Sequence, residues 1–119
     1  MRTSTPPLPA MQAQAPAESG IVRVPRSIGL TAVQILGARC GAVIDNPSDM
    51  ALLFFIPAGA AWDTDGAELL DADRLVTLPP PRRVSGPGPY WRVCPGGDRW
   101  HTDPGALYAA MEDAREAGR

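Results

Sequence analysis

Four residues in the second half of the chain have side chains suited to gripping a phosphate or stacking on a base. Arg82 and Arg83 follow a run of three prolines, and Tyr90 and Arg92 lie on the next apolar segment. Alternate side chains of an extended segment share a face, so Tyr90 and Arg92 are expected to project to one side. Together the four would form a cationic and aromatic patch, typical of a nucleotide or nucleic-acid contact. A solvated loop beside an edge strand with a protective arginine explains the same residues without a ligand.

Carboxylates are the second group of residues that could do chemistry. The candidate acids are Asp45, Asp49, Asp63, Asp65, Asp71 and Asp73. The last four form two pairs at i,i+2 spacing, and on extended backbone such a pair points to one side and could share a magnesium ion. Acids that solubilise ordinary turns are the competing interpretation. Asp71 and Asp73 are therefore only weak candidates for metal ligands, and we predict no metal site and no cofactor.

The remaining catalytic residue types are few. His101 is the single histidine, and neither Ser48 nor Ser85 lies in the strand-turn-helix elbow that presents a nucleophile, so we expect a structural or solvent-facing histidine. Cys40 and Cys94 are far apart and, with one histidine, cannot supply four zinc ligands. We expect two buried free thiols. No glycine pattern predicts a phosphate-binding loop.

The first half of the chain predicts the elements that would carry these residues. The alternating β-branched run 21–24 indicates a strand, and the apolar spacing in 29–36 indicates a helix that ends at Gly37. A second strand is expected at 42–44, followed by a turn. The most apolar segment, 51–56, predicts a central strand with both faces covered.

The second half is expected to hold a hairpin. Residues 67–72 fit one helical turn or an edge strand, and 75–78 and 90–93 predict paired strands. The loop from Pro79 to Pro89 is expected to project from the sheet, because consecutive prolines donate no ladder hydrogen bonds. Alternation also predicts that Trp91 and Val93 share one face.

The last element is a helix over 104–116, with Asp103 as its N-cap and Pro104 at its first position. Taken together, the segments predict an α/β (α+β) fold. Its mainly antiparallel sheet would have four or five strands, with two helices packed on it.

Composition limits the classes of function. The chain has 119 residues, 14 prolines, 12 glycines and a net charge of −2, so any nucleic-acid contact must come from a local arginine patch. No apolar run is long enough to span a membrane and no signal peptide is recognisable, which predicts a cytoplasmic protein. Residues 1–20 are rich in proline and alanine and predict a disordered tail, followed by one domain over 21–119.

Three blocks between Met50 and Val93 follow one another in a recognisable order. They are Leu52 to Phe55, Leu70 to Pro81, and Ser85 to Trp91. An apolar strand with an aromatic pair precedes an acidic turn and a strand that runs into prolines, and a Ser-Gly turn precedes an aromatic strand. This order resembles the second half of the prim-pol domain at the N-terminus of bifunctional DNA primase/polymerases. The resemblance covers residues 50–93 only.

The chain departs from the pattern that this resemblance implies for a polymerase site. Such a site would use a pair of metal-binding acids after an early strand, a histidine and a further acid in the turn. Ala51 stands about where the histidine is expected, and Asp45 is one acid where a D-x-D pair is needed. Only Asp71 or Asp73 matches the last acid. The resemblance therefore implies a truncated relative that has lost nucleotidyl transfer.

Three functions follow from these patterns. The first is a non-catalytic prim-pol-like module that binds single-stranded nucleic acid, a nucleotide or a replication protein. The second is a protein interaction or regulatory domain whose proline-rich loop enters an aromatic groove. The third is a metal-assisted hydrolase or transferase that uses the paired aspartates. A contiguous arginine surface would favour the first, and an exposed apolar patch around Trp62 or Trp100 the second.

Overall fold

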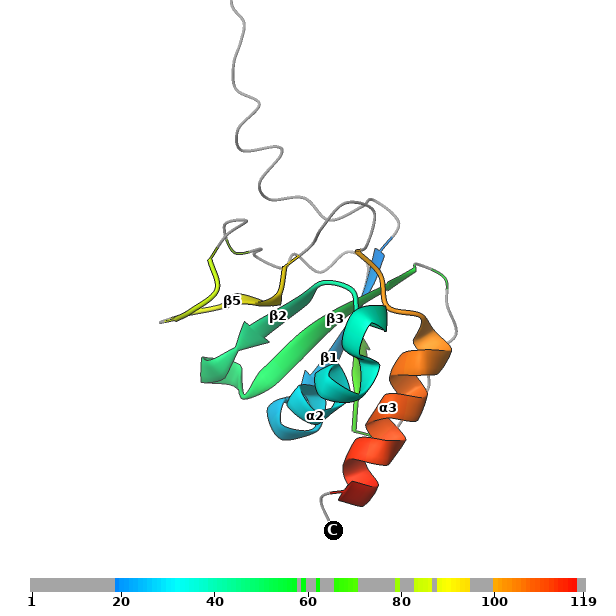
Figure 1. Ribbon diagram of the computed structural model, residues 1–119. Coiled ribbons are helices and arrows are strands. Elements are labelled where there is room, and N and C mark those ends of the chain that lie inside the picture. Colours follow the sequence, from blue (N-terminus) through cyan, green and yellow to red (C-terminus); the bar gives the residue numbers. More distant parts are fainter. Residues whose placement is uncertain are drawn as a thin grey trace, which may run out of the picture.

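The computed structural model describes residues 19–57, 59, 62, 66–70, 79, 83–86, 88–94 and 100–117. Within them the chain forms a five-stranded sheet and two helices (Figure 1). The strands are β1 (Ser19–Pro25), β2 (Val43–Asn46), β3 (Ala51–Pro57), β4 (Glu68–Leu70) and β5 (Tyr90–Val93). The helices are α2 (Arg26–Leu36) and α3 (Pro104–Ala117), and the short 3-10 turns are η1 (Gly37–Arg39) and η2 (Pro47–Asp49).

The sheet has the strand order β4-β1-β3-β2-β5, and its paired strands are antiparallel. The predicted small α+β fold is confirmed. β3 is central, and its residues from Ala51 to Ile56 are buried, as its continuous apolar run predicts. Of the predicted tail, residues 1–18 lie outside the described part. Ser19 and Gly20 belong to β1, because β3 extends far enough to pair with them.

Helix α2 begins three residues before the predicted start, directly after Pro25. The backbone N–H of Arg26, its first residue, donates to the carbonyl of Met50 at 2.9 Å. Gly29 lies inside the helix, where a glycine normally weakens a helix prediction. Here it permits close packing, since a Cβ at Gly29 would lie 2.8 Å from Leu52 Cδ1.

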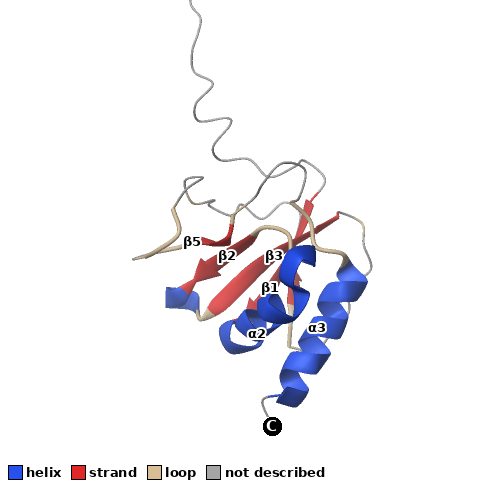
Figure 2. Ribbon diagram, in the orientation of Figure 1, coloured by secondary structure: helices blue, strands red, loops and turns tan. Residues whose placement is uncertain are grey.

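Both helices cover the same face of the sheet (Figure 2). Between them and the sheet lies the larger core cluster, which includes Val22, Leu52 and Phe54 from the strands and Leu107 and Met111 from α3. The predicted cap of α3 is present, because the N–H of Ala106 donates to Asp103 Oδ2 at 3.0 Å. This face is therefore a conventional helix-on-sheet core.

The opposite face holds a second cluster rich in aromatic rings. Phe55 and Trp91 each pack edge-on against Trp100, with ring centroids 5.5 and 5.8 Å apart. Pro79 is buried, and its carbonyl accepts the indole N–H of Trp91 at 3.3 Å. The expectation that the loop projects from its first proline onward is thus wrong at Pro79. A buried indole needs an acceptor, and a proline carbonyl can supply one.

The outer strands of the described sheet are β4 and β5. Of the two possibilities for residues 67–72, the edge strand is the observed one, as β4 paired with β1. β5 forms as predicted and pairs with β2. The predicted strand 75–78, and hence its pairing with β5, lies outside the described residues.

A register shift between β2 and β5 corrects one prediction about side-chain direction. Val43 pairs with Val93 and Ile44 with Trp91, which leaves Arg92 as an extra residue in β5. Val93 therefore packs against the helix-side cluster while Trp91 packs on the other face, although strict alternation predicts one face for both.

Candidate functional site

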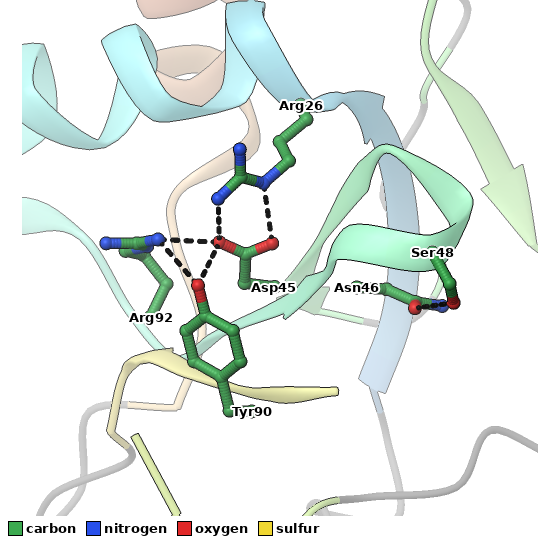
Figure 3. A network of polar contacts seen from close by, with 6 residues as sticks. All are labelled: Arg26, Asp45, Asn46, Ser48, Tyr90 and Arg92. Carbon is green, nitrogen blue, oxygen red and sulfur yellow. Dashed lines mark hydrogen bonds and ion pairs between the residues drawn. The ribbon is translucent and has the colours of Figure 1, made fainter. Parts of the chain in front are cut away.

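Asp45 lies near the end of β2, where the start of α2 and the strand β5 come together. Tyr90 is its neighbour across the β2–β5 ladder, and Arg92 is the extra residue of the register shift. Arg26 opens α2 and reaches the same point from the other side. Figure 3 shows the three side chains directed at the carboxylate of Asp45.

Every polar contact of this group is short. Arg26 donates from Nε to Asp45 Oδ1 at 2.9 Å and from Nη2 to Oδ2 at 3.1 Å, which is the paired geometry that guanidinium and carboxylate groups favour. Arg92 Nη2 and the Tyr90 hydroxyl donate to Oδ2 at 2.7 and 3.0 Å. Arg92 Nη2 also donates to the Tyr90 hydroxyl oxygen at 2.9 Å. Oδ2 of Asp45 therefore accepts three hydrogen bonds and Oδ1 accepts one.

Burial and hydrogen bonding oppose each other at Asp45. Its side chain is 0% exposed, and desolvation by itself would raise the pKa of the carboxyl group. Hydrogen bonds from Arg26, Arg92 and Tyr90 outweigh that effect and hold the pKa below its ordinary value. The hydrogen bonding between Arg26 and Asp45 also raises the pKa of Arg26. The Asp45 carboxyl group is thus ionised at neutral pH.

The arginines, unlike the aspartate, reach the surface. The side chains of Arg26 and Arg92 are 28% and 35% exposed. Two guanidinium charges and one carboxylate charge leave one positive charge over. Arg26 Nη1 and Arg92 Nε and Nη1 take no part in the hydrogen bonds to Asp45 and Tyr90, so each guanidinium keeps donors for another acceptor. The Arg92 guanidinium also lies 5.5 Å from the centre of the Tyr90 ring.

The structure brings together some of the predicted site residues. Tyr90 and Arg92 are in direct contact. Arg83 is exposed, and its carbonyl accepts the backbone N–H of Trp91 at 2.8 Å, which places its backbone beside β5. Arg82 lies outside the described residues.

Sequence reasoning missed Arg26 as a member of this group and assigned Asp45 to the turn after residues 42–44, whereas Asp45 lies within β2. A charged residue that ends an apolar strand is itself a signal, because a buried carboxylate requires partners. The identity of those partners carried no comparable signal. Arg26 and Arg92 lie 19 and 47 positions from Asp45 in the chain, and only the folded sheet brings them together.

The predicted acids give no metal site in the described part of the chain. Asp63, Asp65, Asp71 and Asp73 lie outside it. Among the residues that the structure does describe, no three metal-ligating side chains come together. Asp49, the last residue of η2, forms an exposed ion pair with Arg23 at 2.8 Å.

The remaining candidates are placed as follows. His101 is half-buried, and its Nε2 lies 2.8 Å from the Ser19 hydroxyl oxygen. Both cysteines are free, but only Cys40 is buried, and burial raises the pKa of its thiol. Cys94 is exposed because it follows the last residue of the edge strand β5, so the expectation of two buried thiols is wrong for it.

Comparison with protein-family models, curated proteins and solved structures finds no match for this chain. No helix in the described residues has both the length and the apolar character needed to cross a bilayer.

Proposed function

We propose that this protein is a non-catalytic module that binds single-stranded nucleic acid. Its binding surface consists of Arg26, Arg83, Tyr90 and Arg92, which we name the arginine–tyrosine surface. The observation that carries the proposal is the buried Asp45, which holds two partly exposed guanidinium groups from separate elements on one carboxylate. The prim-pol-like order of residues 50–93 is the reason to look for the ligand among nucleic acids.

The chemistry of the surface suits a phosphate beside an unpaired base. Guanidinium N–H groups bind phosphate oxygens in a planar, paired geometry. The Arg92 guanidinium lies beside the Tyr90 ring, and both planar groups are of the kind on which an unpaired base stacks. In a duplex the base faces are already stacked, so this mode favours a single strand.

The surface is compact, which limits its reach. Arg26 and Arg92 both contact the same oxygen, Asp45 Oδ2, so their guanidinium groups converge on one point instead of tracking a strand. The Asp45 carboxylate cancels one of the two guanidinium charges, so few phosphates can be neutralised and the salt dependence of binding should be shallow.

The surroundings of Asp45 support a binding role and not a polymerase role. A metal ion needs carboxylate oxygens with free lone pairs, and those of Asp45 already accept from two cations and a hydroxyl. A metal ion bound to Asp45 would also lie against two guanidinium charges, which repel it. We therefore assign Asp45 to the support of the surface.

The proline-rich interaction domain is less well supported. Pro79, the first residue of the proposed presenting loop, is buried, and its carbonyl accepts the indole N–H of Trp91. Trp62 and Trp100 are half-buried and pack against the two core clusters, so neither forms the centre of an exposed apolar patch.

Fluorescence anisotropy with a labelled single-stranded oligonucleotide of about ten nucleotides tests the proposal. We expect binding at about 50 mM NaCl, with a slope of log K against log salt no steeper than about −2, because single strands contribute about −0.7 per phosphate. Arg92→Ala should weaken binding about five-fold or more. Arg39→Ala is the matched control. Arg39 carries the same charge, but it lies beyond the end of α2 opposite Arg26, and the helix spans about 16 Å along its axis.

Two results would contradict the proposal. Equal losses in Arg92→Ala and Arg39→Ala would show that only net charge matters, and the arginine–tyrosine surface would not be the site. Incorporation of nucleotides by the purified protein with magnesium or manganese would overturn the non-catalytic assignment.

A further inference from the structure

We infer that Asp45 is a positioning residue for nucleic-acid binding, so that removing its negative charge weakens the binding of a negatively charged ligand. This inference rests on the proposed function and deepens it. Net charge alone would predict that removing a negative charge strengthens the binding of a negatively charged ligand, so the expected change in affinity has the opposite sign.

Asp45 can influence a ligand only through its neighbours. Its carboxylate is 0% exposed and cannot itself meet a phosphate in solvent. It acts only through the side chains around it, namely Arg26, Tyr90 and Arg92. Long-range repulsion of a ligand by this charge is offset by the two adjacent guanidinium groups.

The side chains of Arg26 and Arg92 have little rotamer freedom left to lose on binding. An arginine on a surface samples many rotamers and loses that freedom when it binds a ligand. Arg26 is fixed by two hydrogen bonds to Asp45, and Arg92 by bonds to Asp45 and to the Tyr90 hydroxyl. Their ordering therefore takes place on folding, before the ligand arrives, because each guanidinium group is already held at Asp45 Oδ2.

Removing the Asp45 carboxylate should release the arginines from these positions. In Asp45→Asn the amide keeps the shape but offers one acceptor oxygen and a donor group that repels guanidinium N–H groups. Arg26 and Arg92 then repel each other across the vacated charge and separate into solvent. The Tyr90 hydroxyl has to share the one remaining acceptor oxygen with both arginines. Binding of the ligand then has to order both arginine side chains, which lowers the affinity.

The matched control lies four residues along the chain. Asp49 is also paired with an arginine, Arg23, but its side chain is 48% exposed and shares no partner with the arginine–tyrosine surface. Asp49→Asn makes the same change of charge. It should leave oligonucleotide affinity unchanged or raise it slightly through electrostatics.

The experiment compares the unchanged protein, Asp45→Asn and Asp49→Asn by anisotropy with the same oligonucleotide. We expect Asp45→Asn to bind about five-fold more weakly or worse, with circular dichroism and thermal melting confirming that it is folded at the assay temperature. Arginine Nε–H signals in ¹H–¹⁵N NMR spectra supply a readout independent of stability. The Arg26 Nε–H signal should be shifted by its bond to Asp45 and should return to the position of a solvated arginine in Asp45→Asn.

Each outcome decides something. If the unchanged protein does not bind, the proposed function and this inference both fail. If it binds and Asp45→Asn binds as well or better, the inference alone fails. Should Asp45→Asn not fold, Tyr90→Phe decides: it keeps every charge and the ring but removes one bond to Asp45 and one from Arg92. It should bind about two-fold more weakly, and unchanged affinity would overturn the inference.

Discussion

Two aspartates four residues apart, Asp45 and Asp49, each pair with arginine in very different surroundings. Asp45 is fully buried and accepts from Arg26, Arg92 and a tyrosine. Asp49 is half-exposed and pairs with Arg23 alone at a similar distance. The pKa of each carboxyl group is held below its ordinary value, chiefly by arginine hydrogen bonds, which at Asp45 must also overcome a larger cost of desolvation.

The difference shows that distance alone does not set the importance of an ion pair. Water competes for Asp49 and for Arg23, and salt screens them, so an exposed pair of this kind contributes little to stability. The carboxylate of Asp45 has no access to water and depends on its protein partners. Its loss would disturb three elements, β2, β5 and α2, which are far apart in sequence.

The largest expected effect is on stability. Asp45→Asn should lower the free energy of unfolding by about 3 kcal/mol, because removing one partner of a buried ion pair leaves the others poorly compensated. The partial exposure of both arginines keeps the loss at the lower end of the usual range. Urea denaturation followed by circular dichroism measures it.

Asp49→Asn is the control for this prediction, and its urea midpoint should stay close to that of the unchanged protein. Equal losses of stability in the two variants would contradict the view that burial makes the difference.

The next effect is on acid stability. The pKa of Asp45 is lower in the folded state than its ordinary value of 3.8, so its contribution is complete above about pH 4. That contribution is lost as the pH falls through the lower, folded-state pKa, because the unfolded state then binds the proton more readily. In Asp45→Asn, thermal stability should fall less steeply below pH 4 than in the unchanged protein.

Melting temperatures measured from pH 2 to pH 6 test this prediction, with Asp49→Asn as the comparison. An identical acid limb in the unchanged protein and in Asp45→Asn would mean that Asp45 does not titrate with the shifted pKa.

The smallest effect is on salt sensitivity. The stabilising contribution of the Asp49–Arg23 pair should shrink when NaCl is raised to about 1 M, where the screening length falls to about 3 Å. The difference in melting temperature between the unchanged protein and Asp49→Asn should then vanish. The difference between the unchanged protein and Asp45→Asn should persist, and a loss of both differences would contradict the contrast between the two sites.

Local sequence patterns determined most of the secondary structure. The apolar runs at 21–24 and 51–56 and the capped helix at 104–116 each follow from residue spacing and end signals, which act over a few positions. The start of α2 was missed because Gly29 weakens the local helix pattern. The close packing on Leu52 that makes a glycine suitable there is a tertiary contact.

The candidate site divides in the same way. Spacing on one strand was enough to place Tyr90 and Arg92 together, since neighbours at i,i+2 meet through local geometry. The register shift that turns Val93 away from Trp91 was not predictable, because it depends on how β5 pairs with β2.

By itself, then, the sequence determined which segments are strands and helices, and that an arginine and a tyrosine share the edge strand. Only the tertiary structure decided that Asp45 is their counterion and that Arg26 joins them. The physical reason is that a buried carboxylate requires donors of some kind, but the order of the strands in the sheet selects which arginines can reach it.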